Sequence, residues 1–354
     1  QKGLKMGSGI PAMWMRGGTS KALYFRREDL PDDICRRDQL LLKIMGSPDK
    51  RQIDGVGGSD PLTSKVAIIS PSEDPEADID YLFLQVAVDK AEVSGSQGCG
   101  NVLAGVGPFA IERGLLRAEA QKTTARIRMC NTGEVAEVII STPDGKVSYD
   151  GNETIDGVPG TSAAIEIFFS NLAGSNCGSL LPTGNVSDIL DGLECTMIDN
   201  GMPCVILKAS DFGITGQENR HQLELNTEVK SAIESIRLKA GGLMELGDVT
   251  KKSVPKMTLV SESLNGGLLN TRSFIPHRVH ASIGVFAAIT VATACVIPNT
   301  VAASLAHLPD GDIYKIEHPS GCSKVRLEFD DNGVIGRTGI IRTARKLMDG
   351  AVYS

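Results

Sequence analysis

A lysine at the end of a glycine-rich loop is one of two residues in this sequence best suited to move a proton. Lys65 lies where a loop containing Gly55, Gly57 and Gly58 meets the apolar run VAII at residues 66–69. If its side chain points into a cleft, burial disfavours the charged form and lowers the pKa towards that of a usable base. The alternative is a lysine at a strand end that reaches solvent, and this segment alone leaves both interpretations open.

The second such residue is Cys99, which stands between Gly98 and Gly100 at the start of the apolar segment 101–113. The first amides of a helix lack backbone partners and carry partial positive charge, so they bind a carboxylate and favour a thiolate. A cysteine placed there can donate or accept a proton beside a bound acid. The alternative is a small thiol that packs a turn. The other seven cysteines lack this setting and are interpreted as packing residues.

Two further segments have residue types that suit an anionic ligand. MRGGTSK at residues 15–21 combines paired glycines, whose backbone can come close to an anion, with two hydroxyls and a lysine. PHRVHASIG at residues 276–284 opens a second apolar helix and supplies His280 and a serine hydroxyl. A strand-to-turn connection explains the first segment equally well, and an ordinary capping or core histidine explains His280.

The chain around these segments is a succession of short strands with a few helices. Asp-Gly and Asn-Gly pairs separate the β-like segments and mark turns. Those segments are residues 65–70, 81–88, 126–129, 135–141, 163–169 and 204–209, and helical periodicity is expected at 37–45, 227–238 and 335–349. Arg342 and Arg345 would lie on the last of these helices and could add an anion contact, although two arginines on a helix are more often solvated.

Two segments are apolar on all sides, so each is expected to be a helix enclosed by other structure. They are residues 101–113 and 282–296, and the second must end by Ile297 because Pro298 follows it. Pro108 should kink the first helix or shift its start. The two helices are separated by about half of the chain, which predicts two similar halves, each a curved sheet wrapped around one central helix.

The expected fold is therefore α+β, with two pseudo-symmetric domains and an active site in the cleft between them. The boundary is expected near the turn-forming segment LPTGN at residues 181–185. The N-terminal domain would cover residues 10–182, completed by about 345–354, and the C-terminal domain would cover residues 183–344.

Composition limits the classes of partner. The net charge of −7 argues against nucleic acid or an anionic membrane, and an aromatic content of 4% leaves few platforms on which bases could stack. The cysteines form no C-x-x-C pair and no zinc-ligand pattern with the histidines, so no zinc site of this kind is expected. Scattered thiols and the lack of a charged-then-apolar opening segment favour the cytoplasm. No G-x-G-x-x-G fingerprint indicates a dinucleotide.

Taken together, the motifs resemble the methylaconitate isomerase family, whose members have the diaminopimelate-epimerase-like fold. The matching stretches are MRGGTSK at 15–21, GGSDPLTSKVAI at 57–68, CGN at 99–101 with GVGPFAIERGL at 105–115, and PHRVHASIG at 276–284. They occur in order from about residue 10 to the C-terminus. One departure is Ala22, where family members often have glycine after GGTSK; the change removes no functional group.

The resemblance implies a mechanism and a set of residues. The lysine of the TSK motif and the cysteine of the CGN motif are the family's acid/base pair and fall on Lys65 and Cys99. The expected substrate-binding residues are the hydroxyls and amides near this pair and at the second helix: Thr19, Ser20, Ser96, Gly100, Asn101, His280, Ser282 and Gly284. The implied reaction is an allylic proton transfer without a cofactor on a small polycarboxylate, in a possible homodimer.

Within the family, the segment RQIDG at residues 51–55, followed by the GGSDPLTSK loop, is most similar to the oxalomesaconate branch, which acts on ring-cleavage products of protocatechuate or gallate. 2-Methylaconitate or aconitate isomerisation is the alternative within the family. A racemase on the same fold needs two facing thiols, but the second helix opens with HASIG and Cys295 lies near its far end. A non-catalytic carboxylate-binding protein would have no reason to keep both Lys65 and Cys99.

Overall fold

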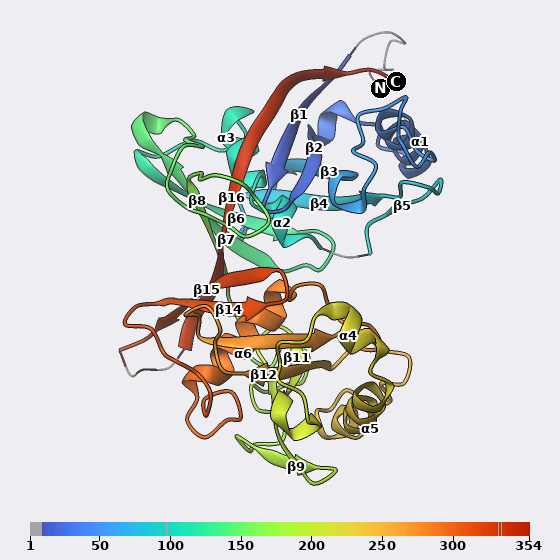
Figure 1. Cartoon of the computed structure of the whole chain (residues 1–354). Coiled ribbons are helices and arrows are strands. Elements are labelled where there is room, and N and C mark those ends of the chain that lie inside the picture. Colours follow the sequence, from blue (N-terminus) through green and yellow to red (C-terminus); the bar gives the residue numbers. More distant parts are fainter. Residues whose placement is uncertain (1–8, 97, 332, 334) are drawn as a thin grey trace. The chain divides into compact units, whose positions relative to one another are not determined.

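The computed structural model describes residues 9–96, 98–331, 333 and 335–354, which divide into two units (Figure 1). Unit 1 contains the residues up to Phe168 together with Ile341–Ser354, and unit 2 is Phe169–Ile340. Both units combine strands and helices, as expected for a two-domain α+β fold. Each unit is described separately below.

The first boundary lies earlier than the expected segment 181–185, for a structural reason. Asp199 of unit 2 accepts hydrogen bonds from the backbone N–H groups of Asn176 and Cys177, at 2.7 and 2.8 Å. The Cys177 side chain also packs in the apolar core of unit 2. The turns at 171–185 therefore belong to unit 2. The last boundary, at Ile341, lies close to the expected residue 345.

Unit 1 is built from a sheet that includes the two ends of the described chain. Its strands are β1 (Ile10–Gly17), β2 (Ser20–Arg26), β3 (Lys65–Pro71), β4 (Ile79–Val86), β5 (Val93–Ser94), β6 (Gln121–Met129), β7 (Val135–Thr142), β8 (Ala164–Phe169) and the later part of β16 (Ile335–Val352). The order is β1-β2-β3-β4-β6-β7-β8, and β16 pairs with β1 from Ile10↔Val352 to Gly17↔Ala344 (Figure 1). Its helices are α1 (Ile34–Met45), α2 (Gly100–Leu103) and α3 (Val106–Glu112).

Unit 2 repeats this plan with its own sheet. Its strands are β9 (Asp188–Leu190), β10 (Leu193–Asp199), β11 (Pro203–Lys208), β12 (Lys256–Ser261), β13 (Leu269–Phe274), β14 (Ile313–His318), β15 (Gly321–Phe329) and the first part of β16. The order is β16-β15-β14-β13-β12-β11-β10-β9. Its helices are α4 (Arg220–Leu225), α5 (Thr227–Leu243) and α6 (Val285–Val296).

The same sequence of strand pairings occurs in both units. From β1 to β7 the pairs β1–β2, β2–β3, β3–β4, β4–β6 and β6–β7 alternate between antiparallel and parallel. From β10 to β15 the pairs β10–β11, β11–β12, β12–β13, β13–β14 and β14–β15 alternate in the same way. In each unit one helical segment joins the first parallel pair and a buried helix joins the second. The predicted internal symmetry is confirmed.

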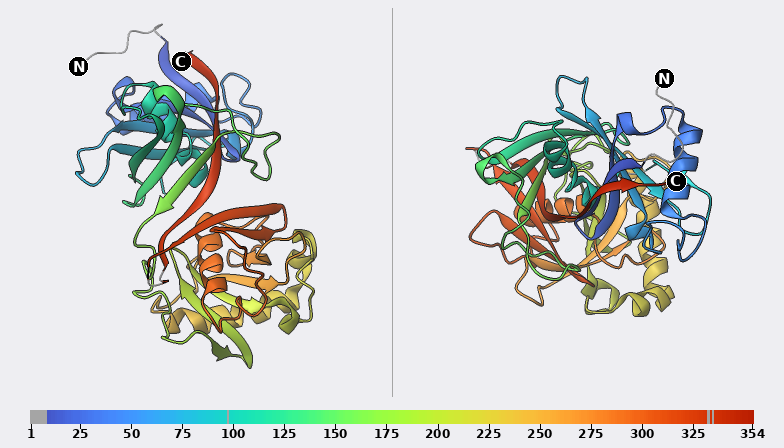
Figure 2. Two further views of the ribbon diagram at one scale, coloured as in Figure 1. Left: turned by 90° about the vertical axis from the view of Figure 1, so that its left-hand side faces the viewer. Right: turned by 90° about the horizontal axis from the view of Figure 1, so that it is seen from above.

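The two buried helices lie against the strands of their own units (Figure 2). Residues Ala287 to Cys295 of α6 are all buried, and α6 contacts β10, β11, β14 and β15. In unit 1 the expected helix at 101–113 is interrupted at Ala104–Gly105, and Pro108 falls in the first turn of α3, where proline is tolerated. The predicted effect of Pro108 is therefore confirmed.

The predicted helix at 335–349 is wrong, because this segment is the strand β16. Its residues pair with β15 in unit 2, through Val325↔Ile340, and with β1 in unit 1. Tertiary pairing overrides the local periodicity. The difference matters for Arg342 and Arg345, since residues three apart share a helix face but point to opposite faces of a strand.

Alternation along the strands gives the sheet of unit 1 an inner and an outer face. Leu23, Val66 and Leu84 belong to an apolar cluster with residues of α1, which covers the outer face. Tyr24, on the other face of β2, contacts Phe109 of α3, with ring centroids 5.9 Å apart. The inner face of unit 1 is therefore the one turned towards α2 and α3.

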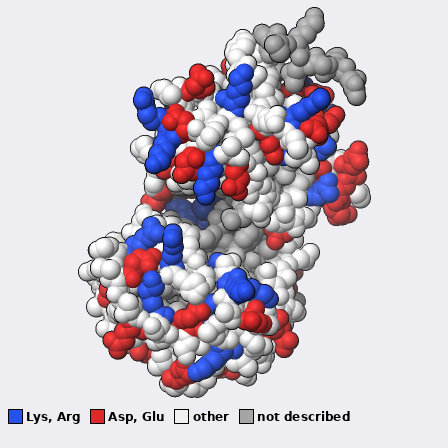
Figure 3. Space-filling model, turned by 90° about the vertical axis from the view of Figure 1, so that its right-hand side faces the viewer, with Lys and Arg blue, Asp and Glu red and all other residues white. Residues whose placement is uncertain are grey.

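The surface of each unit carries both signs of charge. On the face drawn in Figure 3, basic and acidic side chains are interspersed over both units. No helix within the described residues has the length and apolarity needed to cross a membrane.

Candidate active site

Strand register brings Lys65 to the inner face of unit 1. Lys65 is the first residue of β3, directly opposite Ala22 of β2 and Gln85 of β4. Val66, the next residue, packs with the outer cluster, so Lys65 points the other way. Lys65 as a whole residue is only 8% exposed. The alternative of a strand-end lysine reaching solvent is thereby excluded.

The buried amine of Lys65 is held by an amide and an aromatic ring. Its Nζ donates to Gln85 Oε1 at 2.6 Å and lies 5.0 Å from the centre of the Phe83 ring. Burial lowers the pKa of the Lys65 ammonium, although the charges of Cys99 and Asp60 act in the opposite direction. A lysine whose neutral form is brought closer to physiological pH is suited to acid/base chemistry.

Gln85 orients this lysine, and no local sequence pattern identified Gln85 as a site residue. Its Nε2 donates to the carbonyl oxygens of Pro61 and Ser64, at 3.0 and 2.9 Å. These bonds direct Oε1 towards Lys65. Ser64 is in turn held by Gln52, whose Nε2 donates to Ser64 Oγ at 2.7 Å. The side-chain amides of Gln52 and Gln85 thus hold the loop that precedes Lys65 in place.

Cys99 lies at the start of α2, as the sequence predicts, but the helix is shorter than expected. Cys99 is the half-buried N-cap residue of a helix of four residues. Its carbonyl accepts from the Tyr81 hydroxyl at 3.2 Å, and the Tyr24 hydroxyl donates to Val102 O at 2.6 Å. Burial, followed by the charge of Cys99, raises the pKa of both tyrosines, which therefore remain neutral donors. These two hydroxyls hold the backbone that carries Cys99, and neither was identified from the sequence.

The hairpin between β1 and β2 contacts the same helix start. A Cβ at Gly17 would lie 2.5 Å from Asn101 O, and one at Gly18, where φ is +52°, would lie 2.1 Å from Asn101 Oδ1. Asn101 Nδ2 donates to Thr19 Oγ1 at 3.3 Å. The paired glycines therefore allow α2 to approach the hairpin. The N–H of Gly18 is used inside the protein, since it donates to Thr343 O at 2.8 Å.

Arg342 reaches the inner face from β16. Gly17 pairs with Ala344, so Ala344 and Arg342 share the face that Gly17 presents to Asn101. Burial lowers the pKa of the Arg342 guanidinium to about 10, and the charge of Cys99 opposes this shift. Arg342 therefore stays positively charged at neutral pH. It forms no ion pair with a described carboxylate, and its Nη1 donates to Ile341 O at 3.1 Å.

Three buried polar atoms of unit 1 have no hydrogen-bond partner within the described residues. They are Ser20 Oγ, Asn101 Oδ1 and Arg342 Nε. Buried polar atoms are nearly always paired, so unpaired ones at one place indicate a missing partner such as a ligand. A hydroxyl and a cation are groups that a carboxylate can satisfy.

Ser96 is less well connected than the other predicted residues of unit 1. It lies in the exposed segment that follows β5, and its hydroxyl contacts Ser94 Oγ at 3.0 Å. Gly100 is half-buried at the first position of α2. The structure thus brings Thr19, Ser20, Asn101 and Cys99 together around the start of α2, with Ser96 at an exposed position three residues before Cys99.

The predicted residues of unit 2 lie where α6 begins. Gly284 is the N-cap of α6, and the N–H of Ser282 donates to His280 Nδ1 at 2.9 Å. Burial, followed by the charges of Lys256 and Arg220, lowers the pKa of His280. The neutral ring therefore carries its proton on Nε2. The Ser282 hydroxyl lies 3.3 Å from Nε2 of His318, a residue that the sequence did not suggest.

The buried cysteines agree with their interpretation as packing residues. All eight cysteines are free, and Cys177, Cys195, Cys204 and Cys295 are buried. Burial raises the pKa of each of these four thiols. They are poor proton carriers for that reason.

Comparison with known proteins yields close relatives over nearly the whole chain. A family model described as PrpF protein matches residues 8–354. The chain is 59% identical over 345 residues to the (4E)-oxalomesaconate Delta-isomerase of Novosphingobium sp. (strain KA1), with 97% of each chain covered. It is 55% identical over 345 residues to the 4-oxalomesaconate tautomerase of Pseudomonas putida, with 97% of this chain and 95% of that protein covered.

Solved structures confirm the expected fold. A crystal structure of methylitaconate-delta-isomerase matches with a TM-score of 0.87 at 36% identity, covering 97% of this chain and 95% of its own. A hydroxyproline epimerase from Agrobacterium vitis matches with a TM-score of 0.51 at 12% identity, covering 98% and 94%, and shares the fold alone. Two units of the same topology, each around a buried helix, are the diaminopimelate-epimerase-like arrangement that the sequence predicts.

Proposed function

Because this chain belongs to the PrpF family and is an isomerase, we propose that it shifts a double bond along a small unsaturated oxo or polycarboxylic acid, and that this acid is 4-oxalomesaconate. The choice of acid rests on the two relatives that are 59% and 55% identical, both of which carry oxalomesaconate in their names. 2-Methylaconitate and aconitate are the alternative substrates.

The proposed chemistry rests on one observation: the buried Lys65 has no carboxylate partner and contacts Gln85 and Phe83 of β4. Tyr81, on the same face of that strand, donates to the carbonyl of Cys99. Either Lys65 or Cys99 removes a proton from the carbon beside a carboxylate or carbonyl, and a dienolate forms. The other group returns a proton to the far end of the allylic system. One proton leaves and one enters, so the reaction needs no electron carrier, and both groups recover their protonation state by exchange with water.

Charge in the dienolate is stabilised by fixed groups of the same face. Arg342 supplies a cation without a carboxylate partner, and the unpaired hydroxyl of Ser20 can donate a hydrogen bond to the developing negative charge. Such groups need little rearrangement during the reaction, and this is the basis of electrostatic catalysis. We assign Arg342 to the carboxylate of the substrate, because a guanidinium can donate two parallel hydrogen bonds to one carboxylate.

A substrate panel tests the proposal. 4-Oxalomesaconate, 2-methyl-cis-aconitate and cis-aconitate would each be incubated with the enzyme, and proton spectra followed over time. Faster isomerisation of 4-oxalomesaconate than of the other two acids supports the assignment. Faster turnover of 2-methyl-cis-aconitate or cis-aconitate would identify that acid as the substrate instead. Binding of an acid without turnover would favour a carboxylate-binding protein.

A racemase is less compatible with the residues at the start of α6. Such an enzyme would need a second reactive thiol there, but the helix begins with Ser282, Ile283 and Gly284. Cys295 is near the other end of α6 and is 2% exposed. Incubation with L-proline, followed by chiral analysis, would reveal racemisation if it occurred.

A further inference from the structure

Three basic side chains lie in one row across neighbouring strands of unit 1, on the outer face of its sheet. Arg16 of β1 is directly opposite Lys21 of β2 on one side and Arg345 of β16 on the other. We call Lys21, Arg16 and Arg345 the basic row. Directly opposed side chains on neighbouring strands are close, so like charges there repel and weaken the sheet.

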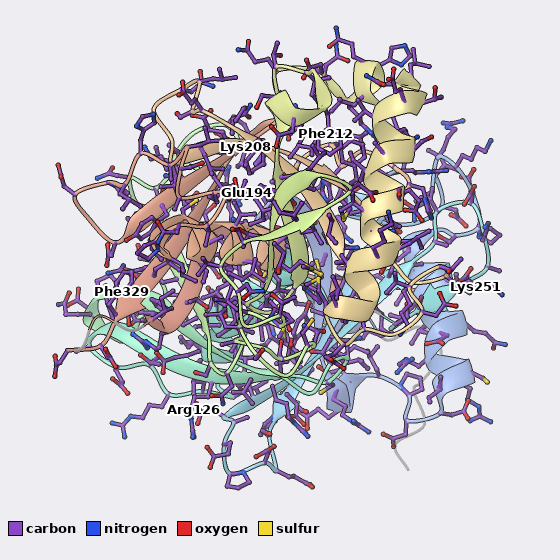
Figure 4. The ribbon with its side chains drawn as sticks, turned by 90° about the horizontal axis from the view of Figure 1, so that it is seen from below. Arg126, Glu194, Lys208, Phe212, Lys251 and Phe329 are labelled. Carbon is purple, nitrogen blue, oxygen red and sulfur yellow. The ribbon has the colours of Figure 1, made fainter. Side chains whose placement is uncertain are left out.

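Two other basic residues of the sheets, Arg126 and Lys208, contact carboxylates. Arg126 of β6 pairs with Asp78 just before β4 at 2.8 Å, and Lys208 of β11 with Glu194 of β10 at 3.7 Å; Lys208 and Glu194 lie side by side in Figure 4. The basic row is different, because none of its members forms an ion pair with a described carboxylate. Burial, followed by the charge of Arg345, lowers the pKa of Arg16, as expected for a cation in an uncompensated setting.

The contacts of the basic row leave much of its positive charge unbalanced. Arg16 Nη1 donates to the carbonyl oxygens of Gly18 and Thr343, at 2.8 and 3.1 Å, and these acceptors are neutral. Lys21 Nζ lies 5.9 Å from the centre of the Trp14 ring. Arg345 has no hydrogen-bond partner within the described residues. The charged groups of Lys21 and Arg345 are therefore free to bind an anion.

A cavity of about 560 Å³ covers this row. Residues 149–162 form its other wall and bring hydroxyl groups to it, including Ser162, whose Oγ lies 3.4 Å from Arg16 Nη2. Asp150 is the one carboxylate among the lining residues, against three cations. The cavity is large enough for a small organic acid, since ligand pockets measure roughly 300–1,000 Å³.

This cavity is separate from the candidate active site. Lys21 follows Ser20 in β2, so the two side chains point to opposite faces of the sheet. The same alternation separates Arg345 from Arg342 on β16. The hairpin at Gly17–Thr19 connects the two faces, and Thr343 O accepts both from Gly18 N, within that hairpin, and from Arg16 of the basic row.

We propose that the basic row and the hydroxyls of residues 149–162 form a second binding site, for a small anion with at least two negative charges. Two guanidinium groups and an ammonium match the oxygens of a polycarboxylate or of phosphate. A bound anion reduces the electrostatic repulsion among the three cations. It also contacts residues 149–162 and so links them to the strands that carry the basic row. The proposal does not depend on the reaction assigned to Lys65 and Cys99.

Calorimetric titration of the whole chain with citrate, and separately with inorganic phosphate, tests the second site. The variant Lys21→Gln/Arg345→Gln removes two charges from the row, and Arg36→Gln/Lys50→Gln removes two charges from exposed positions of the same unit. Saturable binding that weakens at least about ten-fold in the first variant, but is unchanged in the second, is the expected result.

Thermal unfolding without any added anion gives a second readout. Removing two repelling charges should leave the melting temperature of Lys21→Gln/Arg345→Gln equal to or above that of the native chain, whereas loss of a merely structural network would lower it. Added anion should raise the melting temperature of the native chain more than that of this variant.

The outcomes separate the possible ligands and can overturn the proposal. Binding of citrate alone assigns the site to polycarboxylates, and binding of phosphate alone assigns it to phosphate groups. Equal binding by the native chain and Lys21→Gln/Arg345→Gln, or no saturable binding of either anion to the native chain, contradicts the second site. Neither result affects the proposed isomerase reaction, which is measured by turnover.

Discussion

The same strand position is occupied by a lysine in both units, and the surroundings of the two lysines differ. Lys65 begins β3 and Lys256 begins β12, each on a strand that is parallel to its predecessor. Burial lowers the pKa of both ammonium groups. Lys65 donates to an amide oxygen and is influenced by Cys99, whereas Lys256 donates to the carbonyl of Ser253 at 2.7 Å.

The thiol near each lysine shows what the difference means. Cys99 is half-buried at the start of the central helix of unit 1. The thiol whose charge affects Lys256 is Cys204, directly opposite on β11, and burial raises the pKa of that thiol well above its usual value. The repeated fold thus supplies a desolvated lysine twice, and among the described residues unit 1 adds a thiol at the start of its central helix and Arg342, whose Nε is buried without a hydrogen-bond partner.

Buried polar groups extend the contrast between the units. In unit 1, Ser20, Asn101 and Arg342 have unpaired atoms. In unit 2, Glu317 accepts from Ser263 Oγ and from three backbone N–H groups, all at 2.8 to 2.9 Å. Unpaired groups are suited to a ligand and satisfied ones to stability. Substitutions in the first set should therefore reduce activity, and substitutions in the second should reduce stability.

The largest effect is expected from the proposed acid/base pair. Lys65→Met or Cys99→Ser should lower kcat by about 10²–10⁴-fold, because each removes one proton-transferring group. The change in melting temperature should be small. Cys35→Ser, at an exposed cysteine on α1, is the matched control and should retain full turnover. Retention of more than a tenth of the native kcat by either variant would remove that residue from the pair.

Arg342 provides the next test. Arg342→Gln should raise KM roughly 10- to 100-fold, since a hydrogen bond to a charged group contributes about 1.5–3 kcal/mol. Arg345→Gln, on the same strand but the opposite face, is the control and should leave KM unchanged. Similar KM values for the two variants would refute the assignment of Arg342 to the substrate carboxylate.

Glu317 tests the prediction that buried groups with satisfied hydrogen bonds stabilise the fold. Burial alone would raise its pKa, but the hydrogen bonds of Leu264, Ser263, Gly267 and Asn265 outweigh burial and lower it. A lowered carboxyl pKa stabilises the fold above the unfolded pKa and loses that contribution as pH falls through the folded value. Glu317→Gln should therefore lower the free energy of unfolding at pH 7 by about 2 kcal/mol, with a smaller loss at pH 3.

Urea unfolding at the two pH values measures this effect, and Glu262→Gln, at an exposed glutamate of unit 2, is the control. Turnover of Glu317→Gln under conditions where it is folded should match the native chain. A large fall in kcat with an unchanged free energy of unfolding would show that Glu317 serves turnover and would contradict its assignment as a stabilising residue.

The smallest effect concerns the pH dependence of turnover. Gln85→Glu would place a carboxylate where Oε1 now lies 2.6 Å from Lys65 Nζ. An adjacent negative charge favours the ammonium, so the pKa of Lys65 should rise. The limb of the pH–rate profile that reports Lys65 should move to higher pH, by about one unit. Gln85→Leu, the control, should disturb the position of the Lys65 side chain but should not raise its pKa. If the pH–rate profile of Gln85→Glu were the same as that of the native chain, the limb would not report the titration of Lys65.

The sequence predicted those features that depend on local pattern. Glycine-flanked Cys99, the strand start at Lys65 and the two apolar helices could all be recognised from neighbouring residues. Gln85, Tyr24, Tyr81 and the orientation of Arg342 could not, because each depends on strand register between distant segments. The error at 335–349 has the same origin, since its apolar periodicity suits a helix but β1 and β15 pair with it.

Solvent deuterium incorporation tests the central claim most directly. The enzyme would be incubated with 4-oxalomesaconate in deuterated water, with Lys65→Met and Cys99→Ser alongside, and the carbon positions followed by proton spectra. The account predicts that deuterium enters at the far end of the allylic system as the double bond moves, and that both variants lose this incorporation. A shifted double bond without solvent deuterium would contradict a transfer through groups that exchange with water, and equal incorporation by the variants would contradict the assigned pair.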